Sequence, residues 1–156
     1  MFRGTVLLSM PTVDDYLDLA ADTELCVALG RMLLAASRLE SDLRTYLQLN
    51  DVTVRADATF GTLAKRLRSA GLLSDNGAMV LDTHRLQRNY LTHSLYDLFA
   101  ARIGEGLMTR EELDDVPLLT ERAWILENNL NGLADIAERR IEELRTGREP
   151  GLIFSP

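Results

Sequence analysis

Residues 22–47, DTELCVALGRMLLAASRLESDLRTYL, establish the architecture of this 156-residue chain. Apolar side chains recur in this segment every three or four residues, which is the spacing of one face of an α-helix. The repeating positions are Leu25, Leu29, Met32, Leu33, Ala36, Leu39, Leu43, Tyr46 and Leu47. We therefore predict one long helix here, with a single buried stripe along its length.

Three later segments have the same helical spacing. They are residues 62–70, 78–102 and 120–145. Gly71 is the predicted C-terminal cap of the first, because glycine readily adopts the left-handed conformation that often ends a helix. Gly104 and Gly106 are predicted to end the second segment, and Pro117 to break the chain before the third.

Long helices with short connections and almost no strand pattern predict an all-α fold, an antiparallel bundle of four to five helices. The chain length fits a single domain. We place the core of this domain at about residues 12–146. Residues 147–156 are expected to form a loose C-terminal tail, although the apolar residues 152–154 could dock on a neighbouring element.

Composition excludes several classes of function. The formal net charge is −7, so the molecule repels polyanions at long range, and tight sequence-independent coating of nucleic acid is not expected. Cys26 is the only cysteine, which excludes an internal disulfide and argues against a structural zinc site. No apolar run reaches the roughly 20 residues that span a bilayer. These features predict a cytoplasmic protein without a metal, a cofactor or a membrane contact.

A polar cluster, RNYLTHSLY at residues 88–96, interrupts the apolar pattern of the predicted helix 78–102. Arg88 offers a fixed fork of donors that suits phosphate oxygens, and Asn89 can bind the same group. Histidine is a residue type that can transfer protons, so His93 is a candidate acid or base. On an ideal helix Arg88 and His93 are about 140° apart. Both can therefore reach one phosphate only through the length of the arginine side chain, a local distortion or a second subunit.

Three other polar residues are candidates to support this cluster. Glu40 falls on the buried stripe of residues 22–47, where a carboxylate needs a partner. We hypothesise that Glu40 holds the Arg88 guanidinium in place. Arg85 and Tyr96 lie on the polar face of the predicted helix that carries the cluster.

The densest positive patch is Lys65-Arg66-Leu67-Arg68. Lys65, Arg66 and Arg68 could guide an RNA backbone to the polar cluster. The alternative is a solvated helix face that offsets nearby acidic residues. Both interpretations stay open at this point.

Residues 88–93, RNYLTH, resemble the signature of the HEPN superfamily: an arginine, a polar residue, three variable positions and a histidine on a late helix of a small bundle. A looser similarity extends over about residues 22–145. The resemblance implies a metal-independent endoribonuclease of toxin or phage-defence type, acting as a homodimer whose two subunits line one cleft. His93 would be the acid or base for attack of the ribose 2′-hydroxyl on the adjacent phosphate. Arg88 would stabilise charge on the phosphate oxygens, and Asn89 would orient the histidine or bind the phosphate.

One toxin branch of that superfamily pairs with a minimal nucleotidyltransferase antitoxin, which modifies a tyrosine two residues after the histidine. This chain has Leu95 at that position and Tyr96 one residue later. The departure puts membership of that branch in doubt, so an antitoxin or other regulatory protein stays a candidate partner without a defined contact. Trp124, Ile125 and Leu95 supply the apolar surface that a homodimer interface along the last two long helices would use.

A second resemblance points to a different class of function. Residues 60–67, FGTLAKRL, followed by Gly71 and Leu72, are similar to a stretch of the mannitol operon repressor family. That family, and HEPN relatives that have lost activity, imply a protein-interaction or regulatory module without catalysis. A sequence-specific DNA-binding protein is disfavoured, because no basic recognition helix stands out and the net charge is negative.

Overall fold

The structure of the chain, a computed structural model, describes residues 19–94, 116–149 and 151–154. The regular elements in this part are all helical, which confirms the predicted all-α bundle. They are α2 (Thr23–Leu49), α3 (Phe60–Ser69), α4 (Asp75–Asn89), the π-helical turn η1 (Tyr90–Ser94) and α7 (Val116–Arg145). No helix among the described residues is long and apolar enough to cross a membrane. Predictions that concern residues 95–115 lie outside the described part of the chain.

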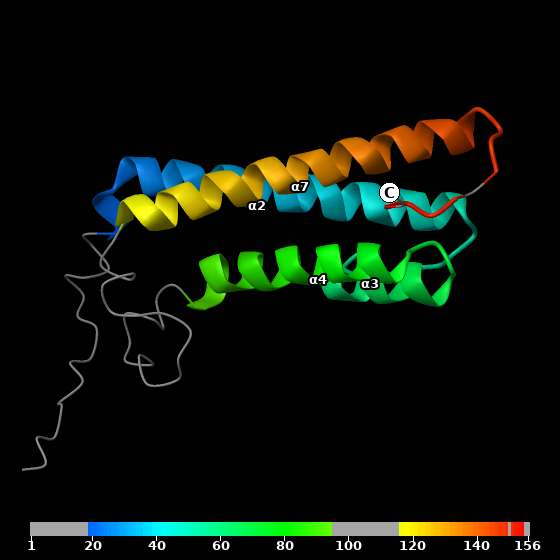
Figure 1. Cartoon of the computed structure of the whole chain (residues 1–156), viewed down its shortest axis with the longest axis horizontal. Helices are drawn as coiled ribbons and strands as arrows, with labels where there is room; N and C mark the ends of the chain where they lie inside the picture. The colour runs from blue at the N-terminus through cyan, green and yellow to red at the C-terminus, as the bar shows by residue number, and fades with distance from the viewer. Residues whose placement is uncertain (1–18, 95–115, 150, 155–156) are drawn as a thin grey trace, which may run out of the picture.

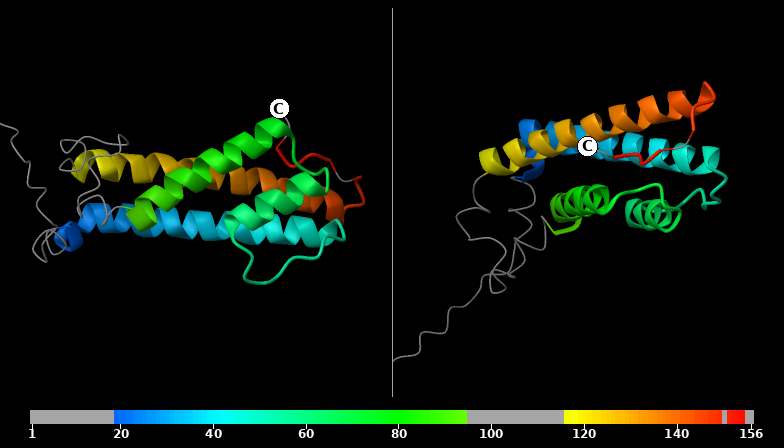
Figure 2. Two further views of the ribbon diagram at one scale, coloured as in Figure 1. Left: turned by 90° about the horizontal axis from the view of Figure 1, so that it is seen from below. Right: turned by 45° about the vertical axis from the view of Figure 1, so that its right-hand side comes forward.

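The two longest helices, α2 and α7, lie side by side and form one layer of the molecule (Figure 1). They run in the same direction, because Arg31 pairs with Glu127 and, further along α2, Arg38 pairs with Asp135 further along α7. α3 and α4 cover one face of this layer, and α4 runs opposite to both long helices (Figure 2). The antiparallel arrangement therefore holds between α4 and the long pair, while α2 and α7 are parallel to each other. Helical periodicity does not encode helix direction, which follows here from the path of the chain through α3 and α4.

Side-chain caps account for the starts of two helices. The Asp22 carboxylate accepts a hydrogen bond from the Leu25 N–H (2.8 Å) at the start of α2. The Ser74 hydroxyl oxygen accepts one from the Gly77 N–H (3.0 Å) at the start of α4. Each cap satisfies one of the backbone donors that lack a partner in the first turn of a helix. The Ser74 cap makes α4 begin three residues earlier than periodicity predicts.

α3 ends just before Gly71, as the position of this glycine predicts. This glycine has a φ of +69°, and its N–H donates to the Arg68 carbonyl (3.1 Å). The next N–H, that of Leu72, donates to the Leu67 carbonyl (2.9 Å). These two bonds form a Schellman motif, which ends an α-helix by satisfying its last free carbonyls.

The prediction that Pro117 breaks the chain is wrong. Pro117 is the second residue of α7, which begins at Val116. First-turn N–H groups have no acceptor within a helix, so the missing N–H of a proline costs nothing there, and its restricted φ suits the helix. Pro117 therefore lies within the first turn of the helix that it was expected to precede.

The hydrophobic core lies along the seam between α2 and α7 and beneath α3 and α4. Most of the predicted α2 stripe is buried, but Leu29 is only partly buried and Leu33 is about half exposed. Ala28 and Ala35 are buried beside the stripe. Small side chains at these positions allow α7 to pack close to α2. The stripe is therefore displaced towards α7, which leaves Leu33 at its outer edge.

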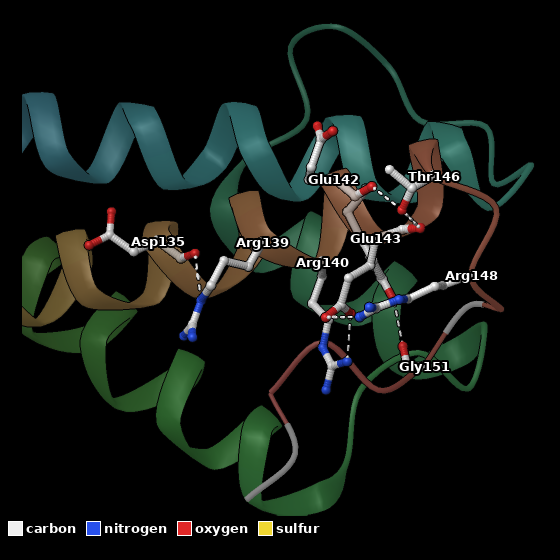
Figure 3. Close-up of polar contacts among 9 residues, drawn as sticks. Asp135, Arg139, Arg140, Glu142, Glu143, Thr146, Arg148 and Gly151 are labelled. Carbon is white, nitrogen blue, oxygen red and sulfur yellow. Dashed lines mark hydrogen bonds and ion pairs between the residues drawn. The ribbon is translucent and has the colours of Figure 1, made fainter.

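Polar contacts fix the end of α7 (Figure 3). The Thr146 hydroxyl donates to the carbonyl oxygens of Glu142 (3.0 Å) and Glu143 (2.9 Å). The Glu143 carboxylate accepts hydrogen bonds from Arg140 (2.9 Å) and Arg148 (3.3 Å). These contacts direct the chain as it leaves α7 and turns back along the bundle.

The expectation that residues 147–156 are loose is wrong for 151–154, and the alternative that the apolar residues of this tail dock on a neighbouring element is confirmed. Ile153 is fully buried and Phe154 nearly so. Burying one large apolar side chain stabilises a fold by roughly 1.5–3 kcal/mol. Burial of these two side chains offsets much of the backbone entropy, about 1–2 kcal/mol per residue, that is lost when the tail becomes ordered.

Hydrogen bonds also hold residues 151–154 against the helices. They join the Tyr46 hydroxyl to the Gly151 carbonyl, Ile153 N–H to the Leu72 carbonyl (2.9 Å), and the Ser74 hydroxyl to the Phe154 carbonyl (3.3 Å). Gly77 makes room for the tail, because a Cβ atom there would lie 3.2 Å from Cβ of Phe154. The docked tail therefore ties the C-terminal end of the chain to the start of α4.

Candidate functional site

An ion pair between α2 and α4 anchors the candidate site. The Arg88 Nη2 atom donates to Oε1 of Glu40 at 2.8 Å. The exposed fractions of the two side chains are 19% for Arg88 and 24% for Glu40. The structure thus contains the contact that the position of Glu40 on the α2 stripe predicts.

Arg88 has hydrogen-bonding capacity that this pair does not use. Its Nε atom is buried and has no hydrogen-bond partner among the described residues. A guanidinium carries five N–H donors, and a buried donor without a partner costs about 1–3 kcal/mol. The Glu40 carboxylate therefore fixes the position of Arg88 without satisfying all of its donors.

A π-helical turn follows Arg88 within the motif. The α-helix ends at Asn89, and η1 takes over from Tyr90 to Ser94. The Thr92 hydroxyl donates to the Arg88 carbonyl at 2.9 Å, a type of contact that bends helices. The prediction of an uninterrupted α-helix over residues 78–102 is wrong at this turn.

This turn changes the angular relation between Arg88 and His93. In an α-helix, hydrogen bonds join residues four apart, whereas in a π-helix they join residues five apart. The extra residue in the turn rotates His93 back towards the helix face of Arg88, which reduces the separation of about 140° that an ideal helix imposes. Of the three ways in which the two groups can approach one phosphate, the structure contains the local distortion.

His93 and Arg88 have different surroundings within one protomer. His93 is exposed, whereas Arg88 is largely covered and paired with Glu40. Asn89 is partly buried at the last position of α4. The His93 imidazole is therefore accessible to another molecule, whereas Arg88 is held by Glu40.

Arg85 is directed away from this ion pair. Its guanidinium donates to Oδ1 of Asp82 at 2.9 Å and 2.6 Å, and its stem passes over Gly61 at the start of α3. A Cβ atom at Gly61 would lie 3.3 Å from Cδ of Arg85. Arg85 therefore contacts α3, and Tyr96, the other predicted supporting residue, lies outside the described part of the chain.

Lys65, Arg66 and Arg68 are all exposed on α3. Arg68 pairs with Asp75 at 2.8 Å. A groove of about 660 Å³ runs between α3 and α4, and its lining includes Lys65 and Arg68 but not Arg66. Of the three residues of the predicted basic patch, Lys65 and Arg68 thus line the groove and Arg66 does not.

Two polar networks between α2 and α7 were not predicted. Arg31 donates to the buried Glu127 carboxylate (2.9 Å) and lies over the Trp124 ring, 4.8 Å from its centroid. Arg31 is nine residues before Glu40, so the two side chains lie on opposite sides of α2. No local sequence signal identifies such a pair, because its members are far apart in the chain.

The second unpredicted network surrounds Arg38, which pairs with Asp135 (2.7 Å) and Glu138 (3.1 Å). Burial raises the pKa of the nearby Asp42 carboxyl, and the charge of Arg38 opposes this shift. Both networks join the two parallel helices and lie away from the Arg88–Glu40 pair. We assign them to the packing of α2 against α7.

Comparison with protein-family models, curated proteins and solved structures finds no match to this chain. Within the described residues, no group of three or more His, Cys, Asp or Glu side chains is arranged to hold a metal ion. The case for a function therefore rests on the residues of the motif and on their geometry.

Proposed function

We propose that the protein is a metal-independent endoribonuclease of toxin or phage-defence type, with its site built on Arg88, Asn89 and His93. The observation that carries this proposal is the Glu40–Arg88 ion pair followed directly by the π-helical turn. The ion pair holds the guanidinium, and the turn brings the exposed imidazole towards the same face. This arrangement fits the roles that the HEPN resemblance implies for the two side chains.

In the proposed reaction, the His93 imidazole takes the proton of a ribose 2′-hydroxyl. The 2′-oxygen attacks the adjacent phosphorus, and the bond from phosphorus to the 5′-oxygen breaks. The leaving 5′-oxygen takes a proton from water. Arg88 stabilises the charge that builds on the phosphate oxygens. The products carry a 2′,3′-cyclic phosphate and a 5′-hydroxyl.

The proposal includes a homodimer. In one protomer Arg88 is largely covered while His93 is exposed, so a two-fold arrangement that places two motifs face to face would let Arg88 of one subunit act with His93 of the other. A symmetric dimer presents the same patch from both subunits, so one motif generates two equivalent sites. In each of these two sites Arg88 comes from one subunit and His93 from the other.

Replacing His93 by alanine is expected to abolish RNA cleavage. Loss of general acid–base catalysis slows a reaction by about 10²–10⁴-fold. The measurement is the cleavage rate of a mixed-sequence single-stranded RNA in EDTA, together with the chemical identity of the product ends. His84→Ala is the matched control, because His84 lies on α4, the helix that precedes the turn carrying His93, contacts Gln87 (3.2 Å) and has no role in the site. Equal cleavage by the wild-type and His93→Ala proteins, or no cleavage of any RNA by the wild type, would reject the nuclease.

A second candidate function is a catalytically inactive interaction or regulatory module. One observation favours it: Met79 and Leu86, seven residues apart on α4, are 69% and 54% exposed. With Val80, which is 41% exposed, they give this part of α4 apolar surface of the kind that binds other proteins. On this alternative the Glu40–Arg88 pair holds α4 on α2 and has no chemical role, so His93→Ala leaves every measurable activity unchanged.

A further inference from the structure

The groove between α3 and α4 is lined by both apolar and charged residues. Its small or apolar lining residues are Phe60, Gly61, Ala64, Ala78, Met79 and Leu81. With a volume of about 660 Å³, the groove falls in the size range of ligand-binding clefts.

The groove is positive in a chain that is otherwise acidic. Three cations line it, Lys65, Arg68 and Arg85, against two carboxylates, Asp75 and Asp82, whereas the whole chain has a net charge of −7. Both carboxylates are already engaged, with Arg68 and Arg85 respectively. Lys65 takes part in none of the ion pairs formed by the described residues. The groove therefore carries a local excess of positive charge. The molecule as a whole, in contrast, would repel a polyanion.

One end of the groove adjoins the candidate site. Arg85 lines the groove, Asn89 follows it by four residues, and His93 follows Asn89 by four more. Residues four apart on a helix are neighbours on its surface. An extended ligand that lies in the groove and passes Arg85 would thus continue along α4 towards Asn89 and His93.

We propose that the α3–α4 groove binds single-stranded RNA and directs it to Arg88 and His93, an inference that rests on the proposed nuclease function. Lys65 and Arg85 bind phosphates of the RNA backbone. Arg85 exchanges its ion pair with Asp82 for a phosphate when the RNA binds. The exposed Met79 and the partly exposed Ala64 and Ala78 contact unpaired bases, as single-strand sites combine a positive groove with contacts to bases. A rigid duplex does not fit, because its bases are stacked inside and cannot reach these side chains.

The test uses the full chain carrying His93→Ala, so that bound RNA is not cut. Binding of a fluorescent oligouridine is measured by anisotropy in EDTA at several salt concentrations. Lys65→Gln and Arg85→Gln are each expected to weaken binding about fivefold or more. Each should also reduce the slope of log K against log salt concentration by about 0.7 for every phosphate contact that is lost. Asp82→Asn is expected to tighten binding, because it frees Arg85 for a phosphate.

Arg66→Gln is the matched control, since Arg66 is adjacent to Lys65 and equally basic but does not line the groove. Its binding is expected to match the parent protein. Equal weakening by Lys65→Gln and Arg66→Gln, or stronger binding of a duplex or of an acidic peptide, would overturn the proposal. Absence of oligouridine binding by the parent protein would overturn it as well.

Failure of this inference is distinguishable from failure of the nuclease. If groove variants lose RNA binding while the wild-type protein cuts no RNA, the groove assignment stands and the nuclease does not. If the wild-type protein cuts RNA in a His93-dependent manner while Lys65→Gln and Arg85→Gln bind and cut normally, the nuclease stands and the groove assignment falls.

Discussion

Replacing Glu40 by alanine is expected to lower the free energy of unfolding by about 2 kcal/mol. Removing one partner of a fully buried ion pair costs roughly 3–5 kcal/mol, because the remaining charge is left without compensation. The Glu40–Arg88 pair keeps about a fifth of its side-chain surface exposed, so water recovers part of that loss. The measurement is urea-induced unfolding of the wild-type and Glu40→Ala proteins at neutral pH.

Asp57→Ala provides a matched control for this prediction. It also removes a carboxylate from an arginine, but the Arg55–Asp57 pair is 85% and 69% exposed, and pairs of that kind contribute little. We expect Asp57→Ala to unfold at the same urea concentration as the wild type. If Glu40→Ala does the same, Glu40 does not anchor Arg88, and the site loses the contact on which its geometry depends.

Replacing Phe154 by alanine is expected to lower the free energy of unfolding by about 3 kcal/mol. Truncation of a buried phenylalanine removes its transfer energy and leaves a cavity. Because Phe154 lies against Gly77 at the start of α4, the loss should also loosen that helix. Thermal unfolding measures the global effect, and hydrogen exchange of the α4 amides measures the local one.

Leu152→Ala tests whether the effect of Phe154→Ala comes from burial. Leu152 belongs to the same tail but is 37% exposed, whereas Ile153 is fully buried. The expected order of destabilisation is Phe154→Ala and Ile153→Ala large, Leu152→Ala small. A chain that keeps wild-type stability after loss of Phe154 would show that the tail does not stabilise the start of α4.

The sequence predicted the long helices because each of them buries one stripe along a regular period. The Gly71 cap was predictable as well, since a helix end of this kind requires a residue that tolerates positive φ. The parallel arrangement of α2 and α7 was not predictable, because the period of a stripe is identical in both directions. The position of Pro117 was wrong, because proline both breaks helices and begins them, and only the surrounding chain decides which.

The candidate site was predicted in part. A carboxylate at position 40 on an apolar stripe requires a cation, and Arg88 was the cation available on the helix that packs there. The π-helical turn was not predicted, because the only local signal is Thr92, whose hydroxyl bonds the Arg88 carbonyl, and threonine at that spacing is common in regular helices. The Arg85 contact with α3 depends on tertiary packing against Gly61, which the helix pattern does not contain.

In the proposed nuclease, Arg88 of one subunit and His93 of the other act on the same phosphodiester. Mixing two inactive variants, Arg88→Ala and His93→Ala, tests this arrangement. Random pairing makes half of the dimers mixed, and each mixed dimer holds one intact site of two, so the mixture refolded together should regain about a quarter of wild-type cleavage activity. A refolded mixture that cuts RNA no faster than either variant alone, while the wild type is active, would contradict the claim.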